Sequence, residues 1–156
     1  MVRAGSKTSE RARSKQRHER HDVAAADSSV ILRLLVRDDD VQNRAARGFL
    51  ASSGHIFIAH VVLVEVVWAL TSTYGFPKPR VIAAIERLLE LEGISIQDAP
   101  LVQRALTNYR AGNADFSDCL ILEIARRENE LPLGTFDARL ARLEGARKLG
   151  AKALRG

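Results

Sequence analysis

Short uncharged apolar runs alternate with longer helical segments along most of this chain. The runs Val23–Ala26 and Ile56–Ala59 are bounded by polar residues or helical stretches, which is typical of strands buried on both faces. Shorter runs at Ile94–Ile96 and Leu131–Thr135 continue the alternation. Helices between successive strands predict βαβ units and hence an α/β fold with a parallel sheet. We expect a closing helix over 138–143 and a weak edge strand after it.

Length and composition favour one domain, residues 22–156. A chain of 156 residues with 46% hydrophobic composition is long enough to bury a core without disulfides or a structural metal. The single cysteine, Cys119, excludes an intrachain disulfide, and no Cys/His spacing suggests zinc. Because the N-terminal segment also lacks the apolar run of a secretory signal, we expect a cytoplasmic protein.

The positive charge is concentrated in residues 1–21. This segment has seven Lys or Arg and two Glu, which accounts for the whole net charge of +5, so the remaining residues are formally neutral. It lacks the aliphatic residues needed to pack, and we predict a basic, disordered N-terminal extension. Three interpretations stay open: an arm that attracts nucleic acid, an appendage with no folding role, or upstream sequence added by a misplaced start codon.

Four carboxylates follow or adjoin the predicted strands. Asp27 and Asp137 each come at a strand's carboxyl end, where ligands bind in open parallel sheets. Glu65 and Asp118 are each on the helix side of a strand-to-helix connection. Glu65 is the only formal charge in the apolar stretch 56–70, where a buried carboxylate is costly unless a metal or a buried Arg pairs with it.

These carboxylates form a candidate metal site. Asp115 and Asp118, three residues apart, share one face at a helix start, where capping and dipole interactions are the alternative explanation. If the strands before Asp27 and Asp137 are neighbours, four carboxylates meet in one crevice, and their mutual repulsion requires compensation. An all-oxygen site suits Mg²⁺ or Mn²⁺ rather than zinc. Such a site activates a water and stabilises charge on an attacked phosphate.

Four segments in this order carry a resemblance to a known family. From residue 22 to about 145 the chain resembles the PIN-domain ribonucleases of the VapC toxin type, through ADSSVILRLLVRDD, IFIAHVVLVEVVWALTSTYG, YRAGNADFSDCLILEIARRE and TFDARLARL. The resemblance implies a PIN-like three-layer α/β/α sandwich with a central, mainly parallel sheet of four to five strands. The acidic residues of the family fall on Asp27, Glu65, Asp118 and Asp137, with Asp115 as an accessory ligand or cap.

The same resemblance implies the toxin of a type II toxin–antitoxin system. Such a protein is an endoribonuclease in which Asp27, Glu65 and Asp118 hold Mg²⁺ or Mn²⁺, while Asp137 binds a second ion or orients the attacking water. In-line attack leaves a 5′-phosphate and a 3′-hydroxyl. The implied partners are the RNA substrate, a cognate VapB-type antitoxin and a second copy in a homodimer, with no membrane.

The first motif departs from the family pattern. The family usually has Asp-Thr-Asn, whereas this chain has Asp27-Ser28-Ser29, which keeps the hydroxyl and loses the amide. This predicts lower activity with the metal ligands retained. The alternative is therefore a catalytically weak or inactive PIN-like module that only binds antitoxin or RNA.

Two other acidic-site classes fit less well. A receiver domain needs a lysine at a late strand end, and no lysine lies next to Asp137 in the sequence. A haloacid-dehalogenase-like phosphatase needs Asp-x-Asp after its first strand, which Asp27 and Ser29 do not provide.

The remaining candidate side chains have a functional and a structural explanation. Arg33, Arg37 and Arg110 are candidates for binding RNA phosphates or acidic antitoxin residues, although an exposed helical Arg is more often a solvated surface group. For His60 and Trp68, inside the apolar stretch, we expect core packing.

Overall fold

The computed structural model describes residues 23–150, and its centre is a three-stranded parallel sheet. The strands β1 (Val23–Ala25), β2 (His55–Ile58) and β3 (Ile94–Ile96) pair in the order β1-β2-β3. Ile56 of the middle strand aligns with Ala24 on one side and Ile94 on the other. This confirms the predicted α/β class and the parallel strand direction. The prediction for residues 1–21 lies outside the described residues.

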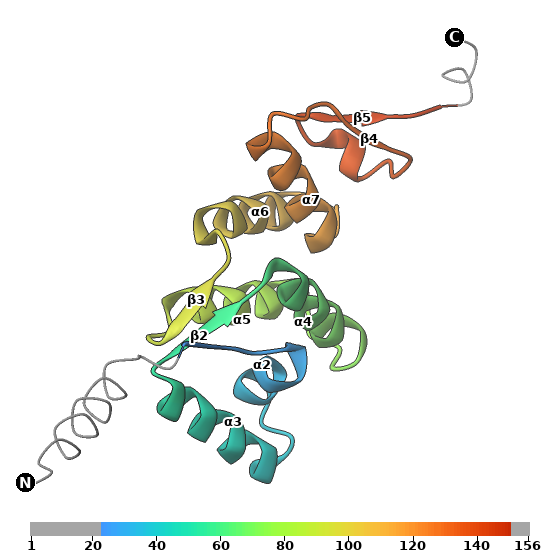
Figure 1. Cartoon of the computed structure of the whole chain (residues 1–156). Coiled ribbons are helices and arrows are strands. Elements are labelled where there is room, and N and C mark those ends of the chain that lie inside the picture. The colour runs from blue at the N-terminus through green and yellow to red at the C-terminus, as the bar shows by residue number, and fades with distance from the viewer. Residues whose placement is uncertain (1–22, 151–156) are drawn as a thin grey trace, which may run out of the picture.

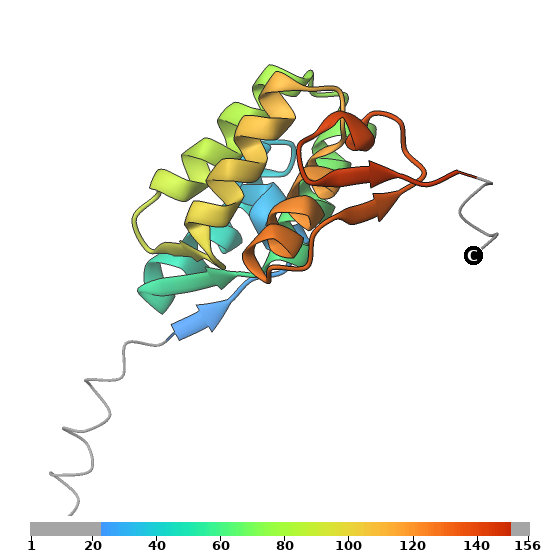
Figure 2. The ribbon, with the colours of Figure 1, turned by 90° about the horizontal axis from the view of Figure 1, so that it is seen from above.

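Helices connect the strands and cover both sides of the sheet. In the view of Figure 1, α2 and α3 lie below the strands, α4 and α5 lie at the height of β2 and β3, and α6 and α7 lie above them. Figure 2 shows α5 and α6 side by side, and α6 packs in turn against α7. The helices are α2 (Ser28–Leu35), α3 (Asp40–Ser53), α4 (His60–Ser72), α5 (Lys78–Glu90), α6 (Ala99–Ala111) and α7 (Phe116–Arg127). In this part of the chain, none of them is long and apolar enough to cross a bilayer.

The core lies between β2 and the helices α4 to α7. Ile56 and Ile58 of β2 are completely buried. The helical spacing of apolar residues in α5 places Val81, Ile85 and Leu88 in the same core. Full burial of each such side chain contributes about 1.5–3 kcal/mol, so this cluster is the main source of stability.

The last part of the chain forms a separate parallel pair of strands. β4 (Leu133–Thr135) pairs with β5 (Ala146–Lys148), and Figure 1 shows this pair beyond α6 and α7, away from β1. The five strands therefore divide into two groups, and the premise that β1 and β4 are neighbours is wrong. The predicted closing helix over 138–143 is a single 3₁₀ turn, η1 (Leu140–Arg142).

A buried carboxylate joins α6 to α7. Glu123 of α7 is only 3% exposed, and its oxygens accept hydrogen bonds from Arg104 Nε at 3.1 Å and Asn108 Nδ2 at 2.9 Å. Arg126 Nε lies 3.5 Å from the same carboxylate. Three donors compensate the buried charge, so the pairing of these two helices is specific rather than merely apolar.

Replacing Glu123 with Ala should reduce the free energy of unfolding by about 1–3 kcal/mol, because the half-buried Asn108 amide loses its partner. The matched control is Glu86→Ala, which removes the exposed ion pair with Arg110 and should cost at most about 1 kcal/mol. Urea unfolding of the two variants measures the difference. Equal losses would show that Glu123 has no special role.

Candidate functional site

Asp27 caps the first helix. Its Oδ1 accepts hydrogen bonds from the backbone N–H of Val30 at 3.1 Å and from the Ser29 hydroxyl at 2.7 Å. The Ser29 bond and then the Val30 bond lower the pKa of this exposed carboxyl below its ordinary value. Asp27 is thus the N-cap of α2, and Ser29, where the chain departs from the family pattern, orients it.

Three other carboxylates gather around one arginine. Asp115 immediately precedes α7, Asp118 lies in its first turn, and Asp137 follows β4. The guanidinium of Arg139 lies 3.0 Å from Asp137 Oδ2 and 3.4 Å from Asp115 Oδ2. We call Asp115, Asp118, Asp137 and Arg139 the α7 acidic cluster.

Asp137 is held in its ionised form. Its pKa falls to about 2, mainly because of the Arg139 side chain and then because Oδ1 accepts backbone bonds from Arg139 at 2.6 Å and Leu140 at 3.2 Å. Its own backbone N–H donates to the Thr135 hydroxyl at 3.0 Å. The turn after β4 therefore fixes both the charge and the position of this carboxylate.

Asp118 experiences the opposite environment. Burial raises its pKa, the charges of Asp115 and Asp137 raise it further, and Arg139 only partly offsets them. The cluster has three carboxylates and one guanidinium, so negative charge is in excess around a half-buried carboxyl. Oxygen donors with uncompensated negative charge are what a hard divalent cation such as Mg²⁺ or Mn²⁺ requires.

Glu65 and Trp68 are on the solvent side of α4. Glu65 is exposed, and Trp68 is 65% exposed, so the expectations of a buried carboxylate and a core tryptophan are both wrong. The buried side of α4 consists of Leu63, Val66, Val67 and Leu70. Because this helix is apolar all round, its sequence pattern did not reveal which side is covered. His60 is half-buried, and its Nε2 has no hydrogen-bond partner among the described residues.

The structure brings together some of the predicted ligands and not others. Asp115, Asp118 and Asp137 share the α7 acidic cluster, whereas Asp27 and Glu65 make no ion pair with it. Within residues 23–150, no three His, Cys, Asp or Glu side chains converge closely enough to form a ready-made metal site. The donor chemistry thus fits a divalent cation, while the predicted ligands are spread over the start of α2, α4, the start of α7 and the turn after β4.

Arg139 is the member of the site that sequence reasoning missed. It lies two residues after Asp137 in the TFDAR string, a spacing that lets its side chain turn back onto the carboxylate. By contrast, two of the three arginines that were predicted as candidates for phosphate binding are paired within the protein: Arg33 with Asp38 at 2.6 Å, and Arg110 with Glu86. The third, Arg37, is exposed.

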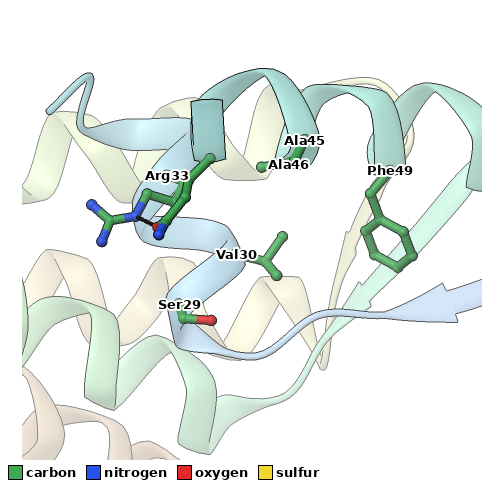
Figure 3. A pocket seen from close by; sticks show the side chains of 7 residues that line it. Ser29, Val30, Arg33, Ala45, Ala46 and Phe49 are labelled. Atoms are coloured by element: carbon green, nitrogen blue, oxygen red, sulfur yellow. Dashed lines mark hydrogen bonds between the residues drawn. The ribbon is translucent and has the colours of Figure 1, made fainter. Parts of the chain in front are cut away.

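Arg33 also borders a groove of about 330 Å³ between α2 and α3. Figure 3 shows Val30 and Phe49 pointing into this space, with the Arg33 guanidinium at one end. Arg33 Nε donates to Gln42 at 2.6 Å, so the groove is closed at that end by groups that already pair with each other. The groove is separate from the α7 acidic cluster, with which it shares no lining residue.

Comparison with known proteins identifies the family. The model of the PIN domain matches residues 24–146, which is most of the chain, and the protein therefore belongs to the PIN domain family, whose members are generally nucleases. Among solved structures it is similar to Mycobacterium tuberculosis VapC20, described as a Sarcin-Ricin loop cleaving toxin, with 16% identity and a TM-score of 0.37. That similarity covers 76% of this chain and 92% of VapC20. No curated protein matches.

The opposite environments of Asp118 and Asp137 predict opposite effects on stability at neutral pH. Since folding raises the pKa of Asp118, its charged form opposes folding above that pKa, and Asp118→Asn should raise Tm by about 1–4 °C at pH 7. Folding lowers the pKa of Asp137, so its contribution is present above the ordinary value of 3.8 and is lost as pH falls toward about 2. Asp137→Asn should therefore lower Tm at pH 7.

Thermal melts of both variants and the wild type between pH 3 and pH 7 provide the test. The Tm deficit of Asp137→Asn should shrink toward the acid end of the range. A lower Tm for Asp118→Asn at pH 7 would contradict the excess of negative charge in the α7 acidic cluster.

Proposed function

We propose that this protein is the toxin of a type II toxin–antitoxin system of the VapC type, a metal-dependent endoribonuclease that hydrolyses RNA phosphodiester bonds. The observation that carries the proposal is the α7 acidic cluster, with its excess negative charge, in a member of a nuclease family. The segments that resemble VapC toxins contain every carboxylate of the site.

The proposed ligands come from four places in the fold. Asp27, Glu65 and Asp118 hold Mg²⁺ or Mn²⁺, Asp137 holds a second ion or orients the attacking water, and Asp115 is an accessory ligand. When bound, the cation supplies Lewis acidity, which makes water more acidic and stabilises charge on the attacked phosphate.

The protein's own groups position the carboxylates and the substrate. Ser29 holds Asp27 by a 2.7 Å hydrogen bond, and Arg139 keeps Asp137 ionised. The Arg139 side chain is 50% exposed, so its guanidinium is accessible to a phosphate oxygen of the substrate as well as to the two carboxylates.

The finer expectations belong to the same proposal. The partners are the RNA substrate, a cognate VapB-type antitoxin that inserts a segment at the α7 acidic cluster, and a second copy of the chain in a homodimer. The proposed location is the cytoplasm.

A catalytically weak or inactive module that binds antitoxin or RNA is the second candidate. Two observations favour it: Ser29 replaces the amide of the family's first motif, and the donor side chains in the described part do not converge on one point.

Cleavage of a labelled single-stranded RNA by the purified protein separates these two functions. The nuclease requires Mg²⁺ or Mn²⁺ and loses activity on chelation, and Asp27→Asn and Asp118→Asn should each reduce the rate at least about 100-fold. The matched control is Asp40→Asn in the first turn of α3, outside the site, which should retain the wild-type rate. An unchanged cleavage rate for Asp27→Asn in Mg²⁺ would contradict the assignment of Asp27 as a metal ligand of the nuclease. RNA binding without any cleavage by the wild type would favour the inactive module.

A further inference from the structure

The exposed tryptophan on α4 has no role in the site described so far. Trp68 is the only tryptophan in the chain, and its side chain is 65% exposed. Tryptophan side chains are mostly buried in folded proteins, because their large apolar surface is costly to hydrate. One exposed apolar side chain is by itself ordinary on a protein surface, and the reason to assign a role to Trp68 is the cavity that it lines.

Trp68 lines a cavity whose wall includes Asp115 of the α7 acidic cluster. The cavity has a volume of about 340 Å³, within the range of sites that bind small organic groups. Asp115 belongs both to the wall of this cavity and to the cluster, where Arg139 pairs with it. A ligand that occupies the cavity is therefore next to the proposed cleavage site.

The wall of the cavity has the chemistry needed for an aromatic heterocycle. Trp68 provides a π-face, Val64 and Val67 provide apolar contacts, and the hydroxyls of Ser72 and Ser117 provide hydrogen-bonding groups. Bases of single-stranded RNA are recognised by this combination, since an unpaired base stacks on an aromatic side chain and presents its edge to polar groups.

We propose that Trp68 is a positioning residue that stacks on an unpaired base of the RNA and so places a neighbouring phosphate at the α7 acidic cluster. This inference rests on the proposed function and adds a substrate preference to it. The substrate is single-stranded at the cleavage site, because a paired base cannot leave its helix to enter the cavity without losing its own stacking and pairing.

The single tryptophan makes the contact directly observable. Asp27→Asn protein in Mg²⁺ leaves the RNA intact, and a single-stranded RNA oligonucleotide should quench the Trp68 emission in a saturable way. An oligomer of equal length and charge with abasic ribose phosphates, and a fully paired duplex, should leave the emission unchanged. Equal quenching by the abasic oligomer, or no quenching by the RNA, would overturn the proposal.

Substitutions on α4 test the role in positioning. Trp68→Ala should weaken RNA binding about 10- to 100-fold, the usual effect of removing one stacking platform, whereas Trp68→Phe should restore most of it. The matched control is Val61→Ala, which changes a 64% exposed side chain on the same helix outside the cavity and should bind RNA like the wild type. Unchanged RNA affinity together with an unchanged cleavage rate for Trp68→Ala would contradict a positioning role.

The failure of this inference can be distinguished from failure of the proposed function. If the wild type does not cleave RNA, base-dependent quenching still supports the stacking contact. If cleavage requires the acidic residues but quenching does not depend on bases, only the stacking proposal fails. Sedimentation tests whether a second copy of the chain binds this surface instead of RNA. If both Trp68→Ala and Val61→Ala convert a dimer to a monomer, the surface binds a second copy and the proposal is overturned.

Discussion

The backbone N–H groups at the start of a helix need hydrogen-bond acceptors, and this need determines where Asp27 and Asp137 lie. Asp27 caps α2, and Asp137 accepts the first backbone N–H groups of the turn that leads into η1. Asp115 has the capping position of α7 but makes no capping bond, which leaves its carboxylate to Arg139. The same local rule therefore fixes two carboxylates in their own turns and leaves a third available to the site.

Behind the site, α6 and α7 are held in place by two buried or half-buried charges. Glu123 joins the two helices, while Lys78 of α5 donates from Nζ to the carbonyls of Tyr109 at 3.0 Å and Gly112 at 2.7 Å. Lys78 also lies 4.5 Å from the centre of the Tyr109 ring. These contacts satisfy the end of α6 and so position the short loop that leads to Asp115 and the first turn of α7.

Much of the fold could be predicted from the sequence, because short apolar runs and capping residues are local signals. The run at Ile56–Ala59 corresponds to β2, and Asp98, a residue type favoured at helix starts, caps α6. The exposure of Trp68 could not be predicted in the same way, since α4 is apolar on every side and only its packing partners decide which side is covered. The separation of β1 from β4 likewise depends on tertiary contacts that no local pattern encodes.

The three carboxylates of the α7 acidic cluster were candidates from the sequence, whereas Arg139 and the arrangement of the cluster were not predicted. Residue types and spacing identified Asp118 and Asp137 as members of one acidic group. The structure places them close enough for the charge of Asp137 to raise the pKa of Asp118. The role of Arg139 as the internal counter-charge depends on how the turn after β4 folds back, which the sequence pattern did not reveal.

The proposed cation site needs Asp27 at the start of α2 and Asp118 in α7 together, and Mn²⁺ binding tests this requirement without reference to any RNA. Calorimetric titration of Mn²⁺ into the wild type, Asp27→Asn, Asp118→Asn and the control Asp40→Asn compares the sites directly. We expect a tight Mn²⁺ site in the wild type and in Asp40→Asn, and its loss in both of the other variants. Wild-type Mn²⁺ affinity in Asp27→Asn would contradict it, because the cation would then be bound without the first helix.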